Sequence, residues 1–120
     1  MKKKNVLIVE DDPVIQNLIE LRLKTMGYDV CGKVYTGEEA LVQVKKLRPT
    51  VVLMDISLKG DIDGIEAARL IKRDFKIPVI FLTGYADDQT LSKVWFVRPD
   101  GFIRKPFDDN DLRIALELVP

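Results

Sequence analysis

Short apolar runs alternate along the chain with longer stretches in which apolar residues recur at helical spacing. Three runs are apolar at consecutive positions, which is typical of parallel strands buried on both faces: 6–9, 51–54 and 79–82. Weaker runs at 28–34 and 101–103 suit the flanks of the same sheet. The pattern therefore predicts five strands separated by helices.

The first helix has a clear start signal. Asp12 can cap it, and Pro13 stands at the first helical position, where a missing N–H costs little. Its expected inner face consists of Ile15, Leu18, Ile19 and Met26. The next helix has capping-box spacing at Thr36 and Glu39 and should stop before Pro49. Three further helices are expected at 63–75, 87–96 and 108–119.

These elements predict an α/β fold, a flavodoxin-like (βα)5 chain closed as a doubly wound five-stranded parallel sheet. Its strand order is expected to be 2-1-3-4-5, which puts the ligand site at the carboxyl ends of the strands. The chain has 120 residues, of which 47% are hydrophobic. That is enough for one core and too little for two, so we expect one domain over 1–120.

The amino-acid composition limits the kinds of partner and of catalytic site that the chain can have. Lys plus Arg and Asp plus Glu both count 19, so no net field would draw the chain onto nucleic acid or a membrane. The apolar stretches are too short for a membrane span or signal peptide, and a cytoplasmic location is expected. The absence of histidine and the single Cys31 exclude Ser-His-Asp triads, histidine zinc sites and an internal disulfide. Carboxylates, hydroxyls and lysines must do the chemistry.

Polar residues follow each strand that we expect in the centre or at the carboxyl-terminal flank of the sheet. They are Glu10-Asp11-Asp12, Asp55, Thr83-Gly84 and Lys105-Pro106. Because parallel strands end at one edge, these residues should meet there. Clustered carboxylates repel one another unless a hard cation such as Mg²⁺ neutralises them. A lysine, a hydroxyl and an exposed amide would then receive an anion at Asp55, as phosphoryl transfer to a carboxylate requires.

Taken singly, each of these features is common in solvated loops, helix caps and turns. Asp12 is best explained as the helix cap, because it directly precedes Pro13. The conjunction of acids, hydroxyl and lysine at successive strand ends is much less expected by chance, and it favours a functional site.

The same residues resemble those of the response-regulator receiver domains of two-component signalling. The resemblance extends over about 4–118, and its motifs occur in the order and at nearly the spacing of the family. They are Val-Glu-Asp-Asp-Pro at 9–13, Asp55, Asp-Gly-Ile-Glu at 63–66, Leu-Thr at 82–83 and Lys-Pro-Phe at 105–107. The resemblance also supports the strand order given above.

The resemblance implies the roles of the acidic residues. Asp55 is the phosphorylated residue, and Asp11 and Asp55 ligate Mg²⁺ together with the backbone carbonyl of Ser57. Glu10 acts mainly through a water molecule on the metal. The domain is then a signalling phosphoacceptor rather than an enzyme, catalysing only its own phosphorylation and slow dephosphorylation.

It also implies the roles of the remaining site residues. Thr83 and Lys105 match the two phosphate-sensing positions, while the backbone at Ser57 and Gly84 contacts the phosphate. Phe102 matches the switch aromatic, and we expect it to be biased inward because phenylalanine has no hydroxyl. The peptide bond from Lys105 to Pro106 is expected to be cis, which only an X-Pro bond allows at low cost.

The sequence departs from the family pattern in two places. Leu58-Lys59 replaces a frequent Met-Pro pair, and the run from Asp55 to Asp63 is one residue longer than usual. Arg98-Pro99 stands where Gly-Ala is common.

Three other functions are compatible with parts of this pattern. A flavin-binding domain of this topology would need a phosphate-cradling loop where the acidic triplet stands, which would repel phosphate. A phosphatase with an aspartate nucleophile usually carries it after the first strand, and Asp55 follows the third. A receiver-like module that works without phosphorylation would not need the complete set of acids, Thr83 and Lys105.

The expected partners follow from the resemblance. They are a histidine kinase or phosphotransfer protein and, as a further partner, a second copy through the face of helix 87–96, strand 101–103 and helix 108–119. No direct nucleic acid or membrane binding is expected. The last helix is short and ends on an apolar stretch, which favours excision from a longer protein over a stand-alone receiver.

Overall fold

A computed structural model describes residues 4–58, 60–84 and 87–120. All sheet pairings in it are parallel, and the strand order is β2-β1-β3-β4-β5, as expected. The strands are β1 (Asn5–Val9), β2 (Asp29–Val34), β3 (Val51–Asp55), β4 (Val79–Thr83) and β5 (Gly101–Arg104). Lys59, part of the unusual pair noted above, lies outside the described residues.

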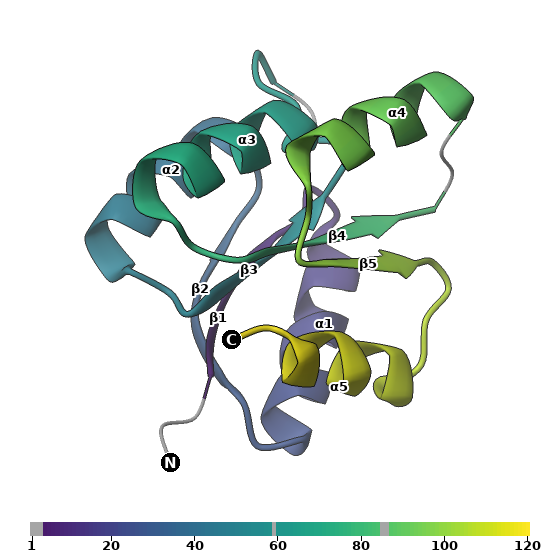
Figure 1. The fold of residues 1–120 in the computed structure, drawn as a ribbon. Helices are drawn as coiled ribbons and strands as arrows, with labels where there is room; N and C mark the ends of the chain where they lie inside the picture. The colour runs from purple at the N-terminus through teal and green to yellow at the C-terminus, as the bar shows by residue number, and fades with distance from the viewer. Residues whose placement is uncertain (1–3, 59, 85–86) are drawn as a thin grey trace.

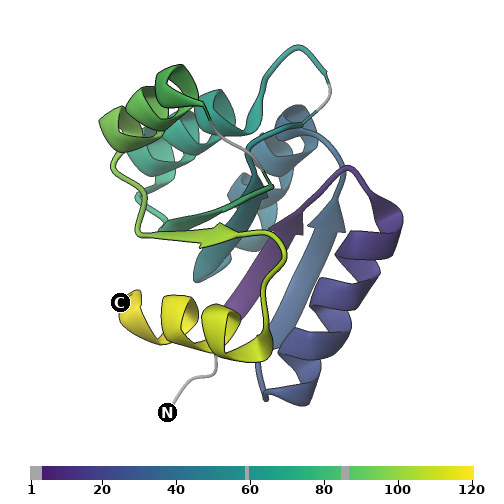
Figure 2. The ribbon, with the colours of Figure 1, turned by 90° about the vertical axis from the view of Figure 1, so that its right-hand side faces the viewer.

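Helices cover both faces of the sheet. They are α1 (Pro13–Thr25), α2 (Gly37–Leu47), α3 (Gly64–Phe75), α4 (Asp88–Val97) and α5 (Asp109–Leu118). Figure 1 shows α2, α3 and α4 on one face and α1 and α5 on the other, and Figure 2 shows the same layers from the side. Among the described residues, no helix has both the length and the apolarity needed to cross a membrane.

The apolar strands supply the core, as their sequence predicted. β3 and β4 are buried at every position, and their side chains alternate between two clusters, one under α2 to α4 and one under α1 and α5. This alternation is what a strand covered by helices on both faces requires.

The expected inner face of α1 was partly wrong. Leu18 is 44% exposed, whereas Gln16, Ile19 and Leu23 are buried. Successive helix residues are turned by about 100°, which carries Leu18 away from the face centred on Ile19. The cap was right, since the Asp12 carboxylate accepts hydrogen bonds from the Val14 and Ile15 amides.

Candidate functional site

The fold brings the carboxyl ends of four strands together. β1 is followed by Glu10 and Asp11, β3 ends at Asp55, β4 ends at Thr83, and β5 is followed by Lys105. The Lys105 amide donates to the Thr83 carbonyl oxygen at 2.7 Å, which extends the pairing of β4 with β5 by one step. All the sequence-predicted acids, the threonine and the lysine therefore lie at one edge of the sheet.

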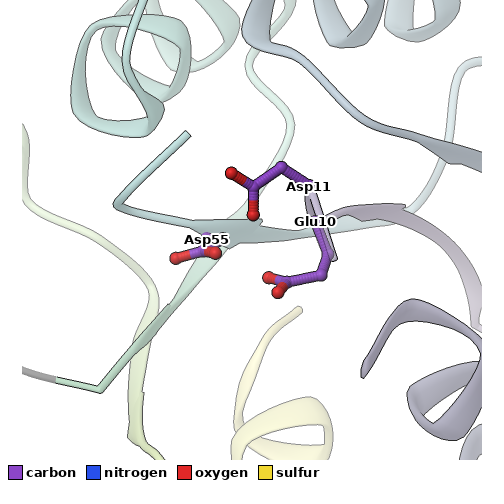
Figure 3. A group of neighbouring side chains, drawn as sticks. All are labelled: Glu10, Asp11 and Asp55. Carbon is purple, nitrogen blue, oxygen red and sulfur yellow. The ribbon is translucent and has the colours of Figure 1, made fainter. Parts of the chain in front are cut away.

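Three carboxylates converge at this edge. One oxygen each from Glu10, Asp11 and Asp55 lies within 4.8 Å of the others. Figure 3 shows the three side chains pointing toward a common space. Glu10 and Asp55 are only 1% and 5% exposed, so their charges are largely removed from water. Buried charges of one sign need a compensating cation nearby.

Lys105 supplies part of that compensation. Its Nζ lies 3.3 Å from both carboxylate oxygens of Glu10 and 3.5 Å from Oδ2 of Asp55. The peptide bond from Lys105 to Pro106 is cis, as the sequence led us to expect. The lysine thus faces two acids from different strands.

One positive charge does not balance the cluster. Burial raises the pKa of the Glu10 carboxyl from 4.5 to about 8, and the neighbouring Asp55 carboxylate adds to the effect. Lys105 acts in the opposite direction but does not outweigh them. The site without a metal therefore favours a proton on Glu10, and a further cation would relieve the same strain.

The donor set fits Mg²⁺. Every candidate ligand atom is an oxygen, and Mg²⁺ prefers a few carboxylate and carbonyl oxygens supplemented by water and phosphate. Asp11 is the most accessible of the three acids, being half-buried at the mouth of the cluster. The residues present could therefore hold this ion.

A backbone amide donates a hydrogen bond to the Asp55 carboxylate. The Ser57 amide donates to its Oδ1 at 3.0 Å. Thr83 is buried, while Gly84 is exposed, and a Cβ at Gly84 would meet no described atom within 4 Å. The described atoms therefore leave open space beside the Gly84 Cα.

Phe102 lies on β5, which is separated from β3 and its terminal Asp55 by β4. It pairs with Phe81 across β4 and β5, is half-buried, and packs against the core cluster that contains Val94. A cavity of about 70 Å³ is lined by Thr83, Leu91, Phe102 and Arg104. Phe102 is thus separated from Thr83 by a small space.

Two supporting residues were missed by the sequence analysis. The buried Gln16 amide donates to the carbonyl oxygens of Glu10 and Val34, at 3.2 and 2.8 Å, and so fixes the acidic loop. A polar residue at an inner-face position of α1 was the available signal. Gly64 seats α3 against the end of β3, where any Cβ would overlap the Asp55 carbonyl group.

Comparisons with known proteins agree with this geometry. A family model described as the response regulator receiver domain matches residues 6–117. The signal receiver domain of a modulated diguanylate cyclase from Desulfovibrio desulfuricans G20 is 35% identical, with a TM-score of 0.94 over 98% of this chain and 94% of that one. A CheY-like receiver domain protein from Methanospirillum hungatei JF-1 is 29% identical, with a TM-score of 0.85 over 98% and 94%.

A third similar structure was solved with a phosphate mimic. The isolated REC domain of RcsB from Salmonella enterica serovar Typhimurium, in the presence of phosphomimetic BeF3-, is 29% identical, with a TM-score of 0.87 over 97% of this chain and 87% of that one. The family match spans nearly the whole chain, and the fold agrees with it throughout. The chain belongs to the response regulator receiver domain family of two-component signalling.

Proposed function

We propose that this domain accepts a phosphoryl group on Asp55 from a phosphohistidine and relays the modification to the face formed by α4, β5 and α5. The observation that carries the proposal is the surroundings of Asp55. Its carboxylate lies beside two other acids, one lysine ammonium and one backbone amide. This combination can hold a cation and a phosphoryl group side by side.

The transfer step needs a free carboxylate oxygen in line with the phosphorus atom. An oxygen of Asp55 forms the new P–O bond while the P–N bond to the donor imidazole breaks, and the nitrogen keeps that electron pair. The product is an acyl phosphate on Asp55, which water later hydrolyses. No proton has to be removed from the nucleophile, because the aspartate attacks in its ionised form.

Asp11, Asp55 and the Ser57 carbonyl would hold Mg²⁺, and Glu10 would reach it through water. When bound, the ion neutralises the acids and withdraws charge from the phosphoryl oxygens. Lys105 then has a new partner, because its ammonium can move from Glu10 and Asp55 to the phosphoryl group. The Ser57 and Gly84 amides and the Thr83 hydroxyl would donate to the remaining oxygens.

The donor protein would approach along α1. Val14, Leu18 and Leu21 are exposed and recur at helical spacing on one face of this helix, which begins directly after the acidic loop. An apolar stripe beside the phosphoacceptor fits a helical kinase or phosphotransfer domain that carries the phosphohistidine.

The response would run from Thr83 to Phe102. When Thr83 moves toward the phosphoryl group, the cavity that Thr83 and Phe102 line would enlarge, and the half-buried Phe102 ring would need only a small shift to fill it. The face that this shift remodels exposes Trp95, Ile114 and Leu118. Exposed apolar side chains of this size suit contact with an output partner or a second copy of the chain.

The proposal is tested by phosphorylation with acetyl phosphate, followed by intact-mass analysis and phosphate-affinity gels. One phosphoryl group should be added when Mg²⁺ is present and none when it is chelated. Asp55→Asn should remove the labelling, whereas the control Asp61→Asn, on the same loop but outside the carboxylate cluster, should not. Undiminished labelling of Asp55→Asn would take the phosphoacceptor role away from Asp55.

A further inference from the structure

The loop that follows Asp55 is attached to α2, a helix that contributes nothing to the carboxylate cluster. The Ile62 amide donates to Oε1 of Glu38 at 2.8 Å. Oε2 of the same carboxylate lies 3.1 Å from the position a Cβ would take on Gly60, whose φ is +114°. Glu38 therefore lies against the loop at Gly60 and at Ile62.

The neighbouring Gly37 brings the backbone of α2 onto the same point. A Cβ at Gly37 would lie 2.8 Å from the Ile62 carbonyl oxygen and 3.3 Å from the Ala67 Cβ. The N-terminus of α2 thus packs on the carbonyl side of Ile62 while Glu38 binds its amide. Two independent contacts from one helix end hold this residue.

The first part of the loop is held by Asp55 itself. The Ser57 amide donates to Oδ1 of Asp55, and the Gly64 amide donates to the Ile56 carbonyl oxygen at 3.2 Å. Ser57 is therefore held at the phosphoacceptor and Ile62 is held at α2. A change at Ile62 can reach the Ser57 carbonyl through a short stretch of chain.

The Glu38 carboxylate stays ionised in this position. The backbone amide of Glu38 itself and the Ile62 amide donate to this carboxylate and hold its pKa below the ordinary range. Hydrogen bonds to an ionised acceptor are stronger than those between neutral groups. Near neutral pH the contact therefore keeps its full strength.

We infer that Glu38 is a positioning residue for the proposed phosphoacceptor site: by binding the Ile62 amide it sets the loop that aims the Ser57 carbonyl at the cation. This inference rests on the proposed function. Groups that orient a metal ligand without touching the metal commonly change metal affinity by about 10-fold or more when they are removed.

Glu39 provides a matched control. It is the next residue of the same helix and carries the same charge, but its Oε1 binds the Thr36 hydroxyl at 3.1 Å and the Tyr35 amide at 3.3 Å. Substituting Glu39 therefore disturbs the helix end without touching the loop. Comparing Glu38→Ala with Glu39→Ala separates positioning of the loop from general weakening of α2.

The experiment measures Mg²⁺ affinity by calorimetry and amide exchange by NMR, both on unphosphorylated protein. Glu38→Ala should raise the dissociation constant for Mg²⁺ roughly 10-fold and speed Ile62 amide exchange by a similar factor. Glu38→Gln keeps one acceptor oxygen, so its Mg²⁺ dissociation constant and its Ile62 exchange rate should lie between those of the wild type and of Glu38→Ala. Glu39→Ala should change both quantities less than about 2-fold.

Equal Mg²⁺ affinity in Glu38→Ala and Glu39→Ala would overturn the positioning role, as would unchanged Ile62 exchange in Glu38→Ala. A wild-type protein that binds no Mg²⁺ and takes no label would instead overturn the proposed function. In that case the Ile62 exchange would still report whether Glu38 holds the loop.

Discussion

Helices α3 and α4 begin in similar ways but differ greatly in how much of each is buried against the rest of the protein. Each follows a central strand that ends at a site residue, Asp55 or Thr83, and each begins with an aspartate cap. α3 buries Gly64, Ala67, Ala68 and Ile71, whereas α4 buries only Val94. α4 also exposes two large aromatic side chains, Trp95 and Phe96.

This difference in burial indicates that the two helices have different roles at the same site. α3 is a fixed support, because Gly64 lies directly on the Asp55 backbone and three apolar residues anchor the helix to the sheet. α4 has little burial to lose when it moves, and segments with few buried contacts open at low free-energy cost. Modification of Asp55 should therefore leave α3 in place and displace α4.

The largest expected effect comes from removing an anchor of α3. Ile71→Ala should lower the free energy of unfolding by about 2–5 kcal/mol, because it deletes a fully buried side chain and leaves a cavity. Phe96→Ala in α4 should change it by less than about 0.5 kcal/mol, since that side chain is 86% exposed. Urea unfolding measures both, and similar losses would remove the distinction between the helices.

The end of β3 at Asp55 and the end of β4 at Thr83 also differ in charge, and the pH dependence of stability can reveal this difference. The Glu10 beside Asp55 has its pKa raised from 4.5 to about 8, so the folded state binds more protons between these values than the unfolded chain. Without metal, the free energy of unfolding should fall as pH rises through this window, by up to about 1.4 kcal/mol per pH unit. Glu10→Gln should flatten the slope. A wild-type profile that stays level between pH 5 and 8 would contradict the assigned cause.

Mg²⁺ should stabilise the surroundings of Asp55 and leave α4 unaffected. The ion would relieve repulsion among Glu10, Asp11 and Asp55, and binding to the folded state alone at about ten times Kd would add roughly 1.4 kcal/mol to the free energy of unfolding. Melting should shift upward by several degrees, and amide protection should rise after β1 and β3 but not in α4. An unchanged midpoint, with Asp11→Ala melting like wild type, would show the site to be misassigned.

The sequence was sufficient to predict the fold and the site acids. Strands such as 51–54 are apolar at every position, which burial on both faces explains. The bounds of the five strands and of α3, α4 and α5 lie within one residue of those expected. The acids could be grouped because parallel strands share an edge. Family membership favours the receiver over the flavin-binding and phosphatase alternatives.

The supporting contacts could not be predicted in the same way. Periodicity placed Leu18 inward and did not identify Gln16, because the phase of a helix with apolar residues on several sides is set by packing. Glu38 reads as an ordinary first-turn acid, and only the path of the loop after Asp55 gives it a partner. Such contacts join segments whose relative position no local pattern encodes.

The most direct test compares the amide NMR spectra of the Mg²⁺-loaded protein with and without beryllofluoride, a phosphoryl mimic, at Asp55. The account predicts large shifts at Thr83, through α4 and at Phe102, and small shifts in α3 beyond its first turn, all absent in Asp55→Asn. The Phe102 ring should move less than Thr83. Shifts confined to the surroundings of Asp55, or equal shifts in α3 and α4, would contradict the account, as would a Phe102 ring that swings inward from full exposure.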